Sequence, residues 1–227
     1  AGLPPRSASN LVVAVQNGGG IRQSGTTAGG QLPESAALPG PLSRRNTLDL
    51  LAFLTNVMTV VPDMSAQEMK LVFERSVSSG FSGAKCTGAG GGQFLQVSQL
   101  RVIADCSKTA QVVTTAGEIT TAGERIRYLA YDPGTPSNLA DDIVLVRDGA
   151  VVAGAPTVSL VTNSFTAGGG DNYPTLKAKA GVQLGATYEQ ALVEYLLTFA
   201  KVGSLPTVPS SDSRYALPGG QGRITFG

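Results

Sequence analysis

Two glycine-rich segments carry the side chains best suited to bind a ligand. Segment 16–22 reads QNGGGIR, and segment 162–173 reads TNSFTAGGGDNY. Glycine lets backbone amides approach an anion closely because no Cβ stands in the way, and Arg22 adds a planar cation that suits phosphate oxygens. Phe165 offers a ring face, and Asp171 can accept hydrogen bonds from a vicinal diol such as that of ribose. Together they predict a surface that holds a phosphorylated, ring-bearing small molecule.

Each segment taken alone also has a plainer interpretation. Triple glycines are commonly tight turns, and the first segment lacks both the Gly-Lys-Ser/Thr of a P-loop and the spacing of a dinucleotide fingerprint. In the second segment, Phe165 can be a core residue and Asp171 a turn carboxylate. Strand-like runs at 11–15 and 158–161 precede the two segments. We therefore expect both loops at strand ends.

The composition excludes several classes of function. The 227 residues contain no histidine, and 17 basic against 16 acidic residues leave a net charge of +1, which gives a nucleic-acid or membrane-surface partner no electrostatic support. Metal-assisted phosphoester hydrolysis needs a metal-bound hydroxide and an acid for the leaving group. The carboxylates are scattered, and we interpret Asp141 and Asp142 as a solvated loop or helix cap. The isolated chain is predicted to be inactive, without a phosphotransfer activity of its own.

The cysteines and the amino terminus bear on the compartment. Cys86 and Cys106 flank a glycine-rich loop and form either a disulfide or two separate buried thiols. The absence of a CxxC spacing and of histidine argues against zinc. Low charge and abundant Ser, Thr and Gly favour an exported domain. No apolar stretch spans a bilayer and no export signal begins the chain, so we expect a mature or excised piece of a secreted, periplasmic or cell-surface protein.

The pattern of apolar residues predicts a single α+β domain over residues 1–227, with a mixed β-sheet covered by helices. Residues 23–46 are expected to form a long loop. Helices are predicted at 47–53, at 65–77 with a Ser65/Glu68 capping box, and at 187–202 with Gly203 after its end. Strands are predicted at 56–61, 94–97, 100–104, 125–131, 157–163 and 223–226, with a hairpin at 143–152 that turns at Asp148-Gly149.

The two glycine-rich segments resemble the signature loops of the carboxy-terminal domain of 5'-nucleotidases. Three further segments resemble the family in the same order along the chain: the helix over 64–77 that ends in Glu-x-Ser-Val, FLQVS followed by LRV at 94–102, and the last strand at 221–224. The resemblance therefore covers nearly the whole chain.

This resemblance implies a two-domain enzyme that removes phosphate from nucleoside 5'-monophosphates or cleaves related nucleotide diphosphates. An amino-terminal metallophosphoesterase domain, absent from this chain, would hold two divalent metal ions, while this domain binds the nucleotide. Asn17 and Arg22 would contact the base and the phosphate or ribose, Phe165 would stack on the base, and Asp171 would bind ribose hydroxyls. The loop glycines complete the implied binding set: Gly19, Gly20 and Gly169. The alternative is a non-catalytic binding or scaffold module without nucleotide affinity.

One turn departs from the family pattern. The family presents a second stacking ring in a Pro-Phe-Gly-Asn turn, whereas this chain has AFLTN at 52–56, without the proline and with a different spacing. Phe53 is the candidate ring, with Asn56 as the turn asparagine, but Leu54 can occupy the ring position instead. A third interpretation is that Phe53 only packs against a short helix.

Overall fold

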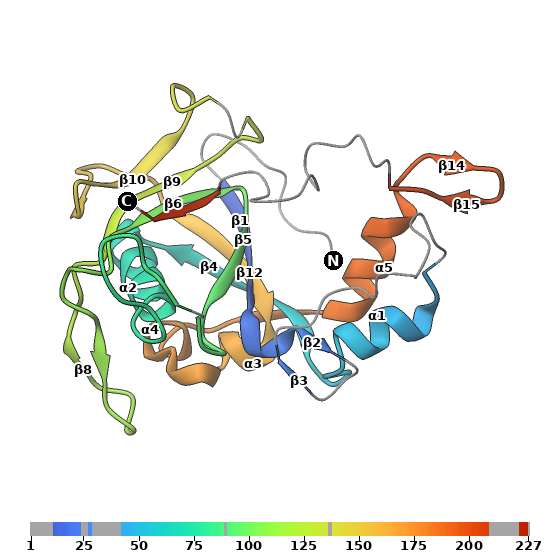
Figure 1. Ribbon diagram of the computed structural model, residues 1–227, viewed down its shortest axis with the longest axis horizontal. Coiled ribbons are helices and arrows are strands. Elements are labelled where there is room, and N and C mark those ends of the chain that lie inside the picture. The colour runs from blue at the N-terminus through green and yellow to red at the C-terminus, as the bar shows by residue number, and fades with distance from the viewer. Residues whose placement is uncertain are drawn as a thin grey trace.

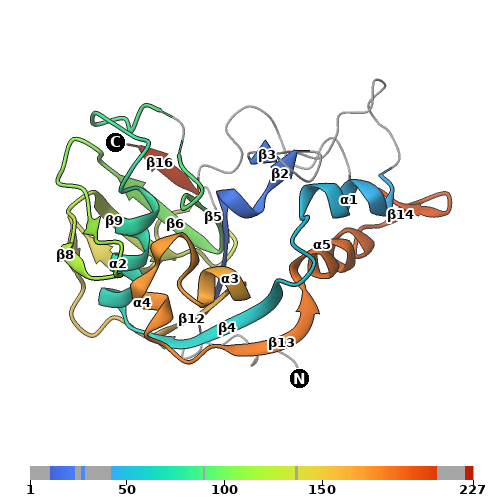
Figure 2. The ribbon, with the colours of Figure 1, turned by 90° about the horizontal axis from the view of Figure 1, so that it is seen from below.

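The described chain is built on two five-stranded mixed sheets (Figures 1 and 2). The computed structural model describes residues 11–23, 27–28, 42–88, 90–135, 138–208 and 223–226. The first sheet has the strand order β13 (Val182–Thr187), β4 (Val57–Met64), β12 (Val158–Asn163), β1 (Leu11–Asn17) and β5 (Leu95–Ser98). The second has the order β11 (Ala150–Val151), β10 (Ile143–Arg147), β9 (Ile126–Tyr131), β6 (Leu100–Ala104) and β16 (Ile224–Phe226).

Helices and short hairpins surround these sheets. The helices are α1 (Arg44–Leu50), α2 (Ala66–Ser76), α3 (Ser164–Ala167), α4 (Pro174–Lys177) and α5 (Tyr188–Leu197), with 3-10 turns η1 (Gly18–Gly20) and η2 (Gly170–Asn172). The two-stranded ribbons are β2 (Arg22–Gln23) with β3 (Thr27–Ala28), β7 (Val112–Val113) with β8 (Ile119–Thr121), and β14 (Lys201–Val202) with β15 (Leu205–Pro206). Helices α1 and α5 lie together at the end of the molecule opposite the second sheet (Figure 1).

One hydrophobic core joins both sheets. It includes Val13 of β1 and Leu160 of β12 from the first sheet, Leu129 of β9 from the second, and Val72 and Phe73 of α2, all at most 2% exposed. The chain passes directly from β5 in the first sheet to β6 in the second. The predicted α+β class is confirmed, with two mixed sheets in place of the one expected.

Several predicted elements are confirmed with their caps. Helix α2 begins with the predicted capping box, in which the Ser65 amide donates to Glu68 Oε2 at 2.8 Å and the Glu68 amide donates to Ser65 Oγ at 3.3 Å. The Asp148-Gly149 turn joins β10 to β11, with φ of 51° and 83° at the two residues. Cys86 and Cys106 form a disulfide, which settles the alternative that the sequence left open.

Other predicted boundaries are wrong. Helix α5 ends at Leu197 and not at 202. Its last turn tightens to an i→i−3 bond, in which the Thr198 amide donates to the Tyr195 carbonyl at 3.0 Å, and the Thr198 hydroxyl donates to the same carbonyl at 2.7 Å. Gly203, with φ of 65°, lies in the β14–β15 turn and does not follow a helix. Helix α1 starts at Arg44, inside the predicted 23–46 loop, most of which lies outside the described residues.

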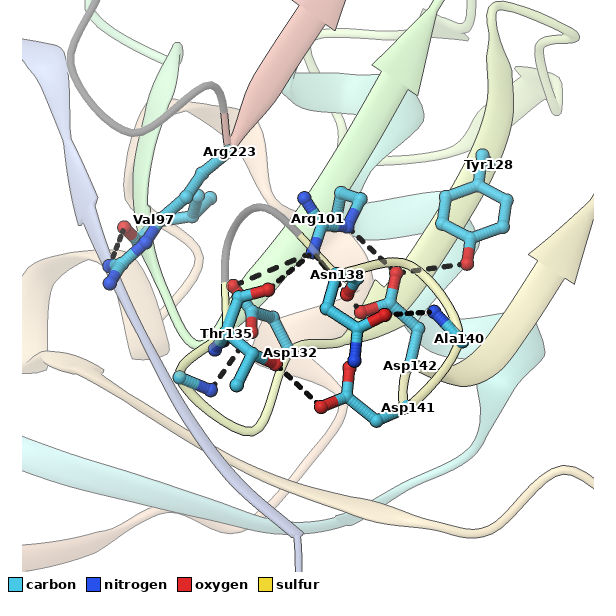
Figure 3. Close-up of polar contacts among 11 residues, drawn as sticks. Val97, Arg101, Tyr128, Asp132, Thr135, Asn138, Ala140, Asp141, Asp142 and Arg223 are labelled. Atoms are coloured by element: carbon cyan, nitrogen blue, oxygen red, sulfur yellow. Dashed lines mark hydrogen bonds and ion pairs between the residues drawn. The ribbon is translucent and has the colours of Figure 1, made fainter.

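An arginine of the second sheet lies beside two buried carboxylates, one of which, that of Asp142, was expected from the sequence to be solvated. Arg101 Nε donates to Asp142 Oδ2 at 2.7 Å, its Nη2 lies 3.9 Å from Asp132 Oδ2, and the side chains of both aspartates are fully buried (Figure 3). The Tyr128 hydroxyl also donates to Asp142 at 3.0 Å. The interpretation of Asp142 as a solvated loop or cap residue is therefore wrong: its carboxylate is half of a buried ion pair.

We predict that Arg101→Met lowers the free energy of unfolding by about 3–5 kcal/mol, because it leaves buried carboxylates without their cation. Urea denaturation at neutral pH measures the change. The matched control is Arg45→Met, which removes an exposed arginine 3.6 Å from Asp49 and is expected to cost less than about 1 kcal/mol. Equal losses in the two variants would contradict a structural role for the Arg101 pair.

Candidate functional site

Five chain segments meet at one edge of the first sheet, which we call the loop edge. Strands β1 and β12 are parallel and end there at Asn17 and Asn163. Strand β4 is antiparallel to β12 and begins there at Val57, which pairs with Thr187 at the end of β13. Strand β5 begins at Leu95, opposite Asn17. Both glycine-rich loops and the turn that carries Phe53 therefore leave the sheet at the same edge, near α3 (Figure 1).

A direct hydrogen bond joins the two glycine-rich loops. Asn17 Nδ2 donates to Asp171 Oδ2 at 2.6 Å, and the Asn17 residue is only 3% exposed. Asn17 Oδ1 accepts from Asn163 Nδ2 at 2.9 Å and from Gln16 Nε2 at 3.1 Å. The Asn17 carboxamide thus holds residues of both loops in one network.

The glycines of the first loop permit close packing. The amides of Gly18 and Gly19 donate to the carbonyls of Phe94 and Gly92 at 2.7 Å and 2.9 Å. These two amides are therefore directed at the neighbouring segment and not at an anion, contrary to the expectation from sequence. A Cβ on Gly20 would lie 2.7 Å from Asn17 Oδ1, so glycine at this position leaves room for the Asn17 network.

The second loop holds Asp171 in an unusual backbone conformation. Asp171 and Asn172 have φ of 55° and 62°, in the left-handed region that non-glycine residues seldom adopt, and Gly169 has φ of 92°. The Tyr173 hydroxyl, fully buried, donates to the Gln93 carbonyl. Burial raises the pKa of Tyr173 well above its ordinary value, so the hydroxyl remains a donor at neutral pH.

Both candidate rings are exposed. Phe165 is 46% exposed, with its ring directly against the backbone of Gly170. Phe53 is 40% exposed and Leu54 is 53% exposed. Arg22 Cζ lies 4.8 Å from the centroid of the Phe53 ring, within the range of a cation–π contact. The ring of Phe53 therefore contacts the first loop through Arg22. Side-chain contacts thus join two pairs of candidate residues, Asn17 with Asp171 and Arg22 with Phe53.

Tyr188, at the start of α5, makes a second connection between the Phe53 turn and the first loop. Its hydroxyl accepts a hydrogen bond from the Phe53 amide at 2.9 Å and donates to the Gly20 carbonyl at 3.4 Å. Burial raises the pKa of Tyr188, although the Phe53 amide and nearby Arg22 act in the opposite direction. The Tyr188 amide also donates to the carbonyl of Asn56 at 3.2 Å. The Phe53 turn is thus fixed to the first loop from a third element.

The two surface hollows do not include the candidate rings, and the described residues form no cluster of metal ligands. Two surface hollows of about 620 and 180 Å³ flank the second loop, and neither has Phe53, Phe165 or Asp171 in its lining. Across the described ranges, no group of three or more His, Cys, Asp or Glu side chains gathers to hold a metal ion. No helix in the same ranges is long and apolar enough to cross a membrane.

The residues that support the site were harder to find from the sequence. Arg75 donates from Nε and Nη2 to the Asp171 carbonyl at 3.0 and 2.9 Å, but in the sequence it is one arginine on an amphipathic helix. Asn163 lies inside the second glycine-rich segment, so the sequence indicated its position near the site. The sequence did not indicate its hydrogen bond to Asn17. Nothing in the sequence around Tyr188 links it to the Phe53 turn.

The comparison with known families decides the assignment. A family model described as "5'-nucleotidase, C-terminal domain" matches residues 5–178. The chain belongs to this family. The match includes both glycine-rich loops, the Phe53 turn and Arg75, whereas β13 and α5 with Tyr188 follow the matched range. No curated protein matches the chain.

Solved structures share the fold of this 5'-nucleotidase C-terminal domain. A 5'-nucleotidase precursor from Thermus thermophilus has a TM-score of 0.56 at 24% identity, over 94% of this chain and 31% of its own. The NAD nucleotidase of Haemophilus influenzae has a TM-score of 0.50 at 18% identity, over 83% of this chain and 27% of its own. A putative Staphylococcus aureus 5'-nucleotidase, solved in complex with alpha-ketoglutarate, has a TM-score of 0.52 at 14% identity, over 86% and 32%. The chain therefore spans about a third of these proteins.

We predict that Tyr188→Phe lowers the free energy of unfolding of this 5'-nucleotidase C-terminal domain by about 1–3 kcal/mol, because the Phe53 amide loses its acceptor. Chemical denaturation measures the change. Tyr195→Phe on the same helix, 42% exposed, is the control and is expected to cost less than about 0.5 kcal/mol. A Tyr188 variant as stable as the control would show that the hydroxyl does not fix the Phe53 turn.

Proposed function

We propose that this chain is the nucleotide-binding, substrate-specificity domain of a secreted 5'-nucleotidase-type phosphohydrolase that acts on nucleoside 5'-monophosphates or related nucleotide diphosphates. The observation that carries the proposal is the 2.6 Å hydrogen bond between Asn17 and Asp171. It places the two signature loops in contact, so that side chains from both can reach one ligand.

Asp171 is suited to the ribose. One carboxylate oxygen, Oδ2, accepts from Asn17, whereas none of the described residues donates a hydrogen bond to Oδ1. The residue is half-buried. An ionised carboxylate is an acceptor only, so the 2'- and 3'-hydroxyls of a ribose supply the donors that this group lacks.

The exposed rings are suited to the base. Phe165 rests on the bare backbone of Gly170 with almost half of its surface exposed, and burial of such a ring by a base is favourable. Phe53 is the better candidate than Leu54 for the second stacking position, because Arg22 and Tyr188 both fix Phe53 to the first loop. A base that stacks on Phe53 uses the ring face opposite Arg22, or displaces Arg22.

Asn17 has a different role in this proposal from the one implied by the family resemblance. Its carboxamide is buried and already bonded to Asp171, Asn163 and Gln16. It therefore acts on the ligand through Asp171. Arg22 remains the candidate for the phosphate side, because it is the cation that the first loop carries.

Hydrolysis itself is assigned to another domain. Phosphate release requires a metal-activated water, and the described residues gather no set of metal ligands. An amino-terminal metallophosphoesterase domain would supply two divalent ions. The exposed rings fit this arrangement, because an open face leaves room for a second domain to close over the ligand.

The disulfide supports an oxidising compartment. Cys86 and Cys106 are both buried and bonded to each other, and structural disulfides persist mainly in secreted, periplasmic or cell-surface proteins. We therefore place the parent protein outside the cytosol.

Two observations favour the alternative of a scaffold without nucleotide affinity. The cation of Arg22 already covers one face of Phe53, and the Asn17 carboxamide is satisfied by neighbouring side chains. A surface whose polar groups and ring face are already paired within the protein gains less free energy from binding a ligand. Titration of the folded chain with adenosine, AMP and UDP-glucose separates the two functions, and a folded sample without response to millimolar nucleoside would favour the scaffold.

We predict that Phe165→Ala weakens adenosine binding by about 5- to 150-fold, because stacking on an aromatic ring contributes about 1–3 kcal/mol per base. Asn17→Ala is expected to weaken it less, because Asn17 acts only through Asp171. Isothermal calorimetry measures both affinities. Leu197→Ala, which shortens a 61% exposed side chain on α5, is the control and should leave the affinity unchanged. Equal losses, or a larger loss in Asn17→Ala, would refute the stacking role.

A further inference from the structure

Arg75 reaches the second loop from the last turn of α2. Its Nε and Nη2 both donate to the main-chain carbonyl of Asp171, at 3.0 and 2.9 Å, and its Nη1 donates to Ser78 Oγ at 3.2 Å. Arg75 forms no salt bridge with a carboxylate in the described part of the chain. Two of the three guanidinium nitrogens thus bind one main-chain carbonyl, and the third binds a hydroxyl on the chain just after α2.

The conformation of that peptide needs such support. Asp171 and Asn172 are two consecutive non-glycine residues in the left-handed region, a conformation that persists only when the surroundings hold it and that clusters at functional sites. Asn172 Nδ2 donates to the Thr114 carbonyl at 3.0 Å. With Arg75 on the Asp171 carbonyl, both strained residues are held by groups from other elements.

Arg75 and Asn17 bind different polar atoms of Asp171. Arg75 binds the carbonyl and Asn17 binds carboxylate Oδ2. Because the peptide and one carboxylate oxygen are both fixed, the direction of Oδ1 is fixed as well. A guanidinium paired directly with the carboxylate would have occupied the acceptors that a ligand needs, and here it binds the carbonyl instead.

We propose that Arg75 is a positioning residue that aims the Asp171 carboxylate at a vicinal diol of the ligand. This inference rests on the proposed nucleotide-binding function. It names Arg75 as the residue that keeps the Asp171 carboxylate oriented for ribose, and so makes the site selective against sugars that lack the diol. Arg75 itself does not touch the ligand. Its effect is therefore on diol selectivity and not on stacking.

The test compares adenosine with 2',3'-dideoxyadenosine, which keeps the base and lacks the diol. In the unaltered protein we expect adenosine to bind about 10-fold more tightly, as for hydrogen bonds to a charged group. In Arg75→Ala the preference is expected to fall to less than about 2-fold. In Phe165→Ala both affinities are expected to fall together, with the preference retained. Calorimetry gives each of these affinities.

Arg127→Ala is the matched control, because Arg127 also donates to a main-chain carbonyl, that of Asp148, but in the β10–β11 hairpin of the second sheet. It should keep the diol preference. Arg75→Lys retains the charge but has its donors on a single nitrogen, so it is expected to recover part of the preference. It replaces Arg75→Ala if that variant does not fold.

The outcomes separate this inference from the proposed function. Binding of neither nucleoside by the folded, unaltered protein would overturn both. Binding with a diol preference that survives in Arg75→Ala or is lost equally in Arg127→Ala would overturn the role of Arg75 alone. Loss of the preference in Arg75→Ala, with its partial return in Arg75→Lys, supports the positioning role.

Discussion

The hydrogen bond from the buried Asn17 carboxamide to the Asp171 carboxylate is the contact on which the arrangement of the site depends. It joins loops that belong to distant parts of the chain, and Asn163 and Gln16 complete the network around it. Inside a protein a hydrogen bond to a charged group is stronger than one between neutral groups. Because Asn17 is almost fully buried, water does not compete for its donors, and the relative position of the two loops is well defined.

The topology of the first sheet makes this contact possible. Parallel pairing of β1 with β12 brings the ends of both strands to the loop edge, and antiparallel pairing of β4 with β12 brings the Phe53 turn to the same place. Tyr188 and Arg75 then fix the Phe53 turn and the Asp171 peptide from α5 and α2. The two candidate rings are exposed and Asp171 is half-buried. The groups that hold them come from separate elements: Asn17 and Tyr188 are buried, and Arg75 is partly buried.

Sequence reasoning predicted the elements with strong local signals and missed those set by tertiary contacts. The Ser65/Glu68 box and the Asp148-Gly149 turn are local, and both are confirmed. Strand β13 was not predicted, since three of its six residues are exposed and its pattern is irregular. Asp171 was singled out from its loop, but no local pattern shows that its carbonyl is held by Arg75. Likewise, the burial of Asp142, just before β10, depends on Arg101, a residue of β6.

The central claim is that Asn17 and Asp171 act as one unit in ligand binding. A double-mutant cycle tests it most directly, with adenosine affinity measured for the unaltered chain, Asn17→Ala, Asp171→Ala and the double variant. We predict a coupling of at least about 1 kcal/mol, because Asn17 has little left to contribute once Asp171 is truncated. Losses that add to within about 0.5 kcal/mol would show that the two residues contribute independently and would contradict the account.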